Sequence, residues 1–232
     1  MVIAISIGIL IAAFIPGFVW LVLFLKEDIH PEPRSIIAKA FGLGALVTLP
    51  VFFIQLGFKY VNGSTYSNIA FFSILAFAFI EETLKFFTGY AFIRKKKEFD
   101  EPIDAMIYLI AIGLGFATIE NLLIVFPHIF SPNVFSLFPA GETIALRFIG
   151  ATLLHTLTGA IMGYYWARGI IKHSQANYIS VGIIISTFIH FAFNYSIILF
   201  QTVNMLYPTI FLVAVAFFVL KDFEKIKERP LQ

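Results

Sequence analysis

Residues 68–93 read NIAFFSILAFAFIEETLKFFTGYAFI, an apolar run of helix length that carries Glu81, Glu82 and Lys85 near its middle. At about 1.5 Å per residue, such a helix crosses a hydrocarbon layer of about 30 Å. One ionised side chain at that depth costs about 2.5–3.5 kcal/mol on insertion scales. Lys85 follows both glutamates within one helical turn, so a helix brings the three groups within reach of one another. They form either an ion pair that neutralises itself or a hydrated, reactive site within the membrane.

The composition of the chain is that of a membrane protein. Of its 232 residues, 59% are hydrophobic and 13% are charged, and the mean hydropathy is +0.91. Soluble domains average about 45–50% apolar and about 25% charged residues. The chain contains no cysteine, which excludes disulfides, thiolate catalysis and cysteine-ligated zinc. It has no basic aromatic patch or nucleic-acid motif, so we expect no nucleic-acid partner.

Seven hydrophobic segments predict an all-α, polytopic membrane bundle of about seven transmembrane helices. Their approximate ranges are 2–25, 36–57, 68–93, 103–126, 142–167, 176–200 and 203–220. The N-terminus lacks the positive region and the cleavage site of a signal peptide, so we expect the first segment to be retained. No linker, repeat or second domain is visible, and residues 1–232 are expected to form one membrane domain. The few residues around 201–204 predict a tight hairpin between the last two segments.

The basic residues predict the orientation of these helices, because cytoplasmic loops are enriched in Lys and Arg. One set of alternate loops holds 13 of the 16 basic residues, namely Lys26, Arg34, Lys39, Arg94, Lys95, Lys96, Lys97, Arg168, Lys172, Lys221, Lys225, Lys227 and Arg229. The opposite loops hold Lys59 alone. An odd number of spans therefore places the N-terminus outside and the C-terminus in the cytoplasm. The run from Arg94 to Lys97 is also suited to contact with anionic lipid.

Polar groups on three further segments fall at a similar predicted depth. Glu120 and Asn121 lie in the outer half of the fourth segment, and His155 lies near the middle of the fifth. His190 and Asn194 share one face of the sixth, because they are four residues apart. A single buried His is more often a structural residue than a ligand. Ionisable groups at one depth on four helices instead predict a shared polar site, since such groups need partners and usually mark function.

Features around these groups have ordinary explanations beside functional ones. The ordinary explanation of Arg147 is an interfacial side chain or a local ion pair. The functional one is that it holds a carboxylate of the site or the backbone of a substrate. Asp104 most simply complements the start of its helix. Five glycines on the fourth and fifth segments predict close helix packing: Gly113, Gly115, Gly150, Gly159 and Gly163.

Paired glutamates with two histidines suit the activation of water for attack on a peptide carbonyl. In one mechanism a Glu takes the proton of the water, while His or Asn donors stabilise the oxyanion. In another, Glu120, His155 and His190 form a zinc-binding set, with Glu81 or Glu82 as base to the metal-bound water. The residue types permit both mechanisms, so zinc and metal-free water activation are equally open.

Four motifs, in this order, resemble those of the PrsW family of intramembrane proteases: Glu81-Glu82-x-x-Lys85, Phe116-x-x-x-Glu120-Asn121, His155 followed by Gly159, and His190-x-x-x-Asn194. That family is related to the type II CAAX prenyl endopeptidases and, more distantly, to the Aph scaffold subunit of gamma-secretase. The resemblance covers about residues 68–200. It implies a multi-pass protein of a prokaryotic cell membrane that cuts a membrane-anchored protein substrate. In the best-known branch the substrate is an anti-sigma factor, cut on its extracytoplasmic side.

The candidate catalytic residues are Glu81, Glu82, Glu120, His155, His190 and Asn194, with Lys85, Asn121 and Arg147 in support. Two other functions are open from the residues alone. A catalytically silent scaffold or binding subunit would capture a membrane partner without turnover. A proton-coupled transporter would also bury carboxylates and histidines, although the lack of visible internal repeats argues against it. The sequence leaves the oligomeric state unknown, and it does not choose the base between Glu81 and Glu82.

Overall fold

The computed structural model describes residues 2–62, 70–129, 137–200 and 206–227. These residues form α-helices and one short 3-10 helix, and none of them lies in a strand. The elements are α1 (Val2–Phe24), η1 (Leu25–Glu27), α2 (Arg34–Asn62), α3 (Ala70–Ile93), α4 (Pro102–Ile129), α5 (Leu137–Ile149), α6 (Ala151–Ile171), α7 (Gln175–Phe200) and α8 (Leu206–Ile226). The predicted all-α class is confirmed.

Six stretches of the described helices are long and apolar enough to cross a membrane. They lie in α1, α2, α4, α7 and α8 and in the pair α5–α6, which forms one stretch from Ala140 to Ile171. Helix α3 has 24 residues, which is also long enough to cross a membrane. It is not one of the six apolar stretches because it carries three charged residues, Glu81, Glu82 and Lys85. Together with α3, the stretches correspond to the seven predicted segments, and the chain is a multi-pass integral membrane protein.

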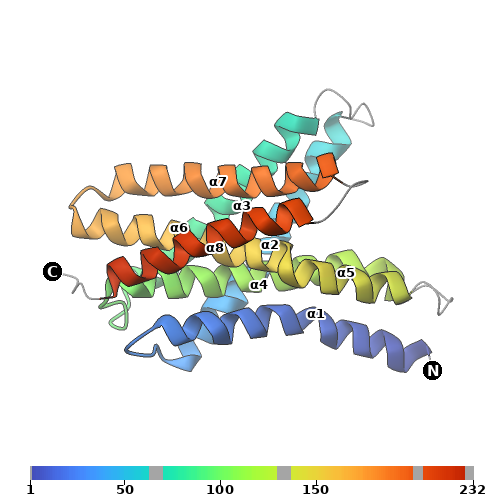
Figure 1. The fold of residues 1–232 in the computed structure, drawn as a ribbon, viewed down its shortest axis with the longest axis horizontal. Helices are drawn as coiled ribbons and strands as arrows, with labels where there is room; N and C mark the ends of the chain where they lie inside the picture. The colour runs from blue at the N-terminus through green and yellow to red at the C-terminus, as the bar shows by residue number, and fades with distance from the viewer. Residues whose placement is uncertain (1, 63–69, 130–136, 201–205, 228–232) are drawn as a thin grey trace.

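The connections rich in Lys and Arg lie together at one end of the bundle. Figure 1 shows the α1–α2 and α3–α4 connections, the α6–α7 turn and the end of α8 at the left, whereas α1 begins at the right. This is the alternation that the basic residues predict. That the basic end faces the cytoplasm stays a prediction from the same rule. The predicted hairpin at 201–204 and Arg229 lie outside the described residues.

The fifth predicted segment is one span but two helices. Helix α5 ends at Ile149 and α6 begins at Ala151, because Gly150 adopts φ −86° and ψ −101°, outside the helical range. Helix α5 also packs against α1 and α4. The break therefore lets the short helix, which ends near Arg147, lie beside α4. The sequence predicts only close packing at Gly150 and gives no sign of this break.

Helices α4 and α6 form the centre of the bundle. Residues 102–118 of α4 and 152–164 of α6 are buried throughout, and the two helices pack on each other, with α2 against α4 and α7 against α6. A Cβ added to Gly113 would lie 2.5 Å from the carbonyl oxygen of His155, and one on Gly159 would lie 2.6 Å from that of Leu109. The close packing predicted from the glycines is confirmed at these two positions.

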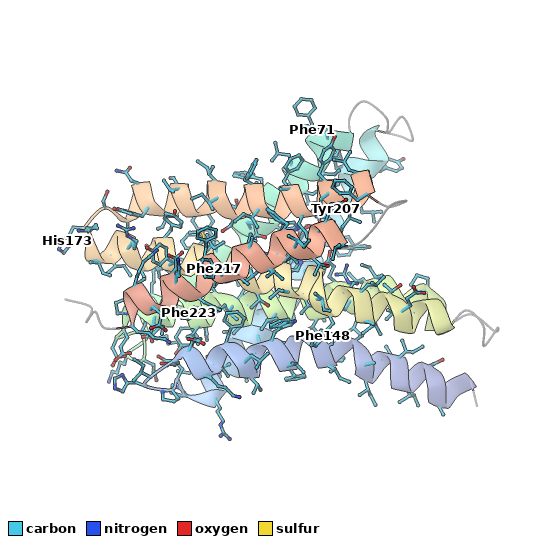
Figure 2. The ribbon with its side chains drawn as sticks, in the orientation of Figure 1. Phe71, Phe148, His173, Tyr207, Phe217 and Phe223 are labelled. Carbon is cyan, nitrogen blue, oxygen red and sulfur yellow. The ribbon has the colours of Figure 1, made fainter. Side chains whose placement is uncertain are left out.

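The outer helices are divided into a packed face and an exposed apolar face. In Figure 2 both Phe217 and Phe223 lie on α8, yet Phe217 is 54% exposed and Phe223 is fully buried. Large apolar side chains are similarly exposed on α2 and α7, including Phe53 and Phe188. Faces of this kind are expected to contact lipid, because lipid tails are as apolar as these side chains and no hydrophobic driving force buries them inside the bundle.

Hydrogen bonds to a side chain of its first turn stabilise the start of α4. Asp104 Oδ2 accepts hydrogen bonds from the backbone N–H of Asp100 at 3.0 Å and of Glu101 at 2.7 Å. This bears out the prediction that Asp104 complements the helix start. One turn later, the hydroxyl of Tyr108 donates to the carboxylate of Glu32, which links α4 to the α1–α2 connection.

Replacing Gly113 by Ala is expected to lower the free energy of unfolding by about 1–3 kcal/mol, because the added methyl has to displace the backbone of His155. Equilibrium unfolding in mixed detergent micelles measures this change. The matched control is Gly57→Ala in α2, where nothing lies within 4 Å of the added Cβ. Since Ala is the better helix former, the control should be neutral or slightly stabilising. Equal stability of the two variants would contradict the close contact between α4 and α6.

Candidate active site

Glu82 lies at the centre of a buried polar network. Its Oε1 accepts hydrogen bonds from Lys85 Nζ at 2.7 Å and from Thr158 Oγ1 at 3.2 Å, and it lies 2.6 Å from Nδ1 of His190. Because a carboxylate beside an ammonium only accepts, we assign a proton to Nδ1 of His190. Only 2% of Glu82 is exposed. One carboxylate thus joins α3 to α6 and α7.

A second branch of the network leads from Lys85 to Arg147. Lys85 Nζ lies 2.9 Å from His155 Nδ1, and since an ammonium only donates, the ring proton of His155 belongs on Nε2. His155 Nε2 lies 3.1 Å from Glu120 Oε2, which also accepts a hydrogen bond from Arg147 at 2.6 Å. The branch connects α3, α6, α4 and α5 through alternating donors and acceptors.

Arg147 holds a carboxylate of the network, which is the functional role that the sequence left open for it beside an interfacial position or a local ion pair. Besides its bond to Glu120, it donates from Nε to Asn121 Oδ1 at 2.6 Å. Asn121 is fully buried and in turn donates to Thr152 Oγ1 at 3.2 Å. The predicted supporting residues Lys85, Asn121 and Arg147 therefore all contact groups of the network.

Glu81 has a buried oxygen without a hydrogen-bond partner. Its Oε1 accepts a hydrogen bond from Gln55 Nε2 at 2.7 Å. Among the described residues, its Oε2 has no such partner, and His190 Nε2 lies 3.7 Å away. Buried polar atoms nearly always have a partner in the protein or in bound water. The unpartnered oxygen of Glu81 therefore marks a position for a water, an ion or a substrate group.

Asn194 is the one candidate catalytic residue that stands apart. It lies one turn along α7 from His190 and is half-buried, but none of the hydrogen bonds that join the network involves it. The other five candidates lie together, and the rings of His155 and His190 are 5.1 Å apart. Gln55 and Thr158 also contact the network, although the sequence did not identify them as site residues. The only indication in the sequence is that each is a polar residue inside an apolar segment. This indication is weak, because such residues commonly bond to their own helix.

The network is closed on one side and open on another. Phe116 covers it from α4, with its ring centroid 5.2 Å from Lys85 Nζ and 5.2 Å from the ring of His155. The side chains of Glu120 and Arg147 are 32% and 16% exposed. The exposed edge of the network is therefore the one that carries Glu120 and Arg147.

Part of the network can hold a metal ion. Glu81, His155 and His190 each offer a ligand atom, and these atoms all lie within 4.8 Å of one another. Two imidazoles with one carboxylate form the donor set of several catalytic zinc sites. A carboxylate on the far ring nitrogen is the usual partner of a metal-bound His, and Glu82 occupies that place on His190. With the unpartnered oxygen of Glu81, the residues fit a zinc ion, although the carboxylate of this set differs from the predicted Glu120.

Comparisons with known proteins agree on one family. Residues 32–221 match the model described as PrsW family intramembrane metalloprotease. A relative from Geobacillus kaustophilus, named Protease PrsW, is 32% identical over 158 residues, which cover 68% of this chain and 64% of the relative. Proteins of the same name from Bacillus subtilis and Oceanobacillus iheyensis are 28% and 32% identical, over 81% and 69% of this chain and 82% and 69% of their own lengths. The chain thus covers slightly less than two thirds of the Geobacillus protein. The search of solved structures found no match to this chain. These relatives are bacterial, as expected for a prokaryotic membrane protein.

Proposed function

Because the chain belongs to the PrsW family of intramembrane metalloproteases, we propose that it is an endopeptidase that cuts a membrane-anchored protein substrate. The observation that supports this most directly is the buried, unpartnered oxygen of Glu81, 3.7 Å from His190. A carboxylate in that state is suited to act on a water molecule. Neither a scaffold nor a transporter accounts for the family match and this oxygen together.

In the proposed reaction Glu81 acts as the general base. Its Oε2 takes a proton from water while the water oxygen attacks the carbonyl carbon of the scissile peptide. The half-buried amide of Asn194, one turn from His190 on α7 and outside the hydrogen-bonded network, is the donor that would stabilise the oxyanion. Glu81 then gives its proton to the amide nitrogen as the C–N bond breaks, which leaves a carboxyl group and an amine.

The remaining charged groups position the reacting ones. Glu82 orients His190 through Nδ1, and Lys85 holds both Glu82 and His155. Arg147 keeps Glu120 beside His155 at the open side. Each of these contacts fixes a ring or a carboxylate before substrate arrives, which avoids reorganisation during the reaction.

We further propose that the substrate is a single-span protein of the anti-sigma-factor type, cut on its extracytoplasmic side in the first step of regulated proteolysis. The exposed part of the network supports this. Glu120 lies in the later half of α4, and α4 starts at the basic end of the bundle (Figure 1). With the basic end in the cytoplasm, the open side belongs to the outer half of the membrane.

Cleavage of a single-span model substrate tests the proposal. The purified chain is reconstituted in liposomes with a substrate tagged at both ends, and the products are resolved on a gel and assigned by mass spectrometry. We expect one cut near the outer membrane face. Stable capture of the substrate without any product would contradict the peptidase and favour the scaffold.

In a metal-bound form of the site the ligands would be Glu81, His155 and His190, and Glu81 would then serve as a ligand in place of its role as the general base. A zinc ion bound there would polarise a water molecule or the scissile carbonyl. To bind through Nε2 as a neutral imidazole, His155 would have to release its Nε2 proton and take a proton from Lys85 on Nδ1, so binding should release a proton and weaken at low pH.

Zinc is therefore expected at about one ion per chain, as measured by elemental analysis of the purified protein. His190→Ala should abolish the zinc content, whereas Glu142→Gln, an exposed residue of α5, should retain it. Chelation should lower the thermal unfolding temperature of the parent chain and leave that of His190→Ala unchanged. An active enzyme with no zinc and with full resistance to chelators would contradict the metal site and leave Glu81 as the sole activator of water.

A further inference from the structure

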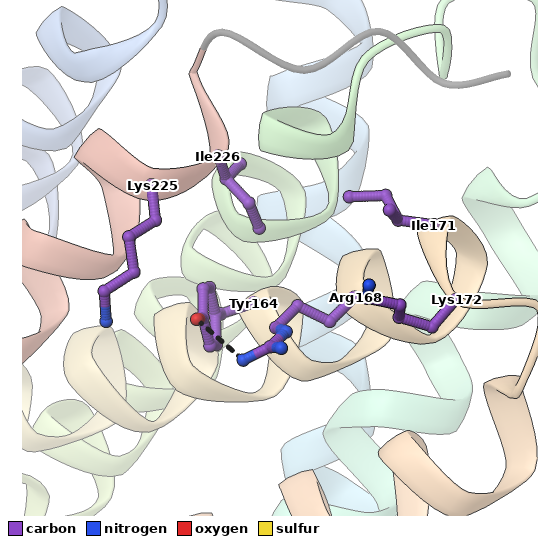
Figure 3. A pocket seen from close by; sticks show the side chains of 6 residues that line it. All are labelled: Tyr164, Arg168, Ile171, Lys172, Lys225 and Ile226. Atoms are coloured by element: carbon purple, nitrogen blue, oxygen red, sulfur yellow. Dashed lines mark hydrogen bonds between the residues drawn. The ribbon is translucent and has the colours of Figure 1, made fainter.

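A cavity of about 180 Å³ opens between α6 and α8 at the basic end of the bundle. Figure 3 shows its lining, which consists of Tyr164, Arg168, Ile171, Lys172, Lys225 and Ile226. Three of the six are cations and none is an acid. The cavity is separate from the candidate active site, because Arg168 lies 13 positions after His155 on α6, a rise of about 20 Å.

The guanidinium of Arg168 is held in place by aromatic side chains. Its NH1 donates to the hydroxyl of Tyr164 at 3.3 Å (Figure 3), and its Cζ lies 5.6 Å and 5.5 Å from the ring centroids of Tyr164 and Tyr178. Among the described residues, no carboxylate oxygen pairs with it. A fixed and uncompensated guanidinium matches the geometry of a phosphate.

The two lysines add positive charge around the same space. Lys172 follows the end of α6, is exposed, and pairs with no carboxylate among the described residues. Lys225 pairs with Asp222 at 2.6 Å, while its Nζ lies 5.6 Å from the ring of Tyr164. Cations at a helix C-terminus also complement the helix dipole. That role, however, requires neither a cavity between the cations nor a guanidinium fixed by two rings.

We propose that this cavity binds the phosphate of an anionic phospholipid headgroup. Anionic lipids gather basic groups at the cytoplasmic membrane surface, and the adjoining face of α8 offers a place for the acyl chains. Phe217, Lys221 and Lys225 follow one another at four-residue spacing, so they share one face of α8. Phe217 is 54% exposed on that face, and Lys221 Nζ lies 4.2 Å from its ring centroid. A free phosphate would use the cations but leave this apolar face without an occupant.

Lipid retention by the full chain tests the proposal. The protein is purified from nanodiscs of phosphatidylcholine with increasing phosphatidylglycerol, and native mass spectrometry counts the bound lipids. We expect one phosphatidylglycerol to be retained in preference to phosphatidylcholine. At about fivefold per cation removed, the double variant Arg168→Gln/Lys172→Gln should weaken this binding about 25-fold. Lys172→Gln alone should weaken it about fivefold, which keeps the test valid if the double variant folds poorly.

The matched control is Arg34→Gln/Lys39→Gln, which removes one exposed arginine and one exposed lysine at the same end of the bundle but outside the cavity. Its retention of phosphatidylglycerol should stay within twofold of the parent. Equal losses in both double variants, or no loss in either, would overturn the proposal. A titration with inorganic phosphate separates the two sources of the anion. Binding of free phosphate that depends on Arg168, without retention of phosphatidylglycerol, would overturn the lipid assignment.

Discussion

Glu81→Gln is expected to reduce cleavage of a single-span substrate by at least about 100-fold without unfolding the protein. General bases contribute about 10²–10⁴-fold to enzymatic rates, and an amide can neither take the proton of water nor bind zinc as a carboxylate does. Gln is nearly the same size and can still bond to Gln55, so the contact between α2 and α3 is kept. Initial cleavage rates in liposomes measure the loss, with thermal unfolding measured in parallel.

Glu142→Gln provides the matched control for this substitution. It makes the same chemical change on the exposed surface of α5, and its cleavage rate should equal that of the parent. If Glu81→Gln kept more than half of the activity, the reacting water would have to lie elsewhere. A loss of activity accompanied by an equal loss of folded protein would show that Glu81 acts through stability instead.

The sequence predicted the meeting of the charged groups, because a charge within the membrane needs a partner. Helix spacing allowed Lys85 to pair with either glutamate, however, and only the structure assigns it to Glu82. That choice depends on how α3 is rotated against α6 and α7. Rotation between helices is set by packing of the whole bundle, which the spacing within one helix does not report.

Two features of the site could not be derived from residue spacing. Gln55 has no charge and sits in an apolar segment, so nothing in its own helix indicated that it would bond to Glu81. The break at Gly150 was hidden because glycines in membrane helices commonly serve close packing. Both features matter for function. Gln55 bonds to one oxygen of Glu81, whose other oxygen has no partner among the described residues, and the break lets α5 present Arg147 to Glu120.

Lys85→Met and Glu82→Gln are each expected to destabilise the protein by about 3–5 kcal/mol, because removing one member of a buried ion pair leaves the other charge uncompensated. Both side chains are at most 5% exposed. The double variant removes both charges and should be less destabilised than the sum of the two single variants, because neighbouring sites of one network couple. Unfolding in mixed micelles measures the three free energies. By contrast, Lys225→Gln breaks an exposed pair with Asp222 and should cost about 0–1 kcal/mol.

The activity of the same variants separates stability from positioning. Lys85 and Glu82 hold Nδ1 of His155 and of His190, respectively. Restoring stability in the double variant does not restore the contact to His155, because Met offers it no hydrogen bond, and the neutral amide at position 82 accepts from His190 without the charge of the carboxylate. We therefore expect the double variant to fold at a near-parental temperature and still cleave at least about 100-fold more slowly. Strict additivity of the unfolding energies would contradict the ion pair. Recovery of cleavage together with stability would mean that these two charges only support the fold, and that the histidines reach their positions without them.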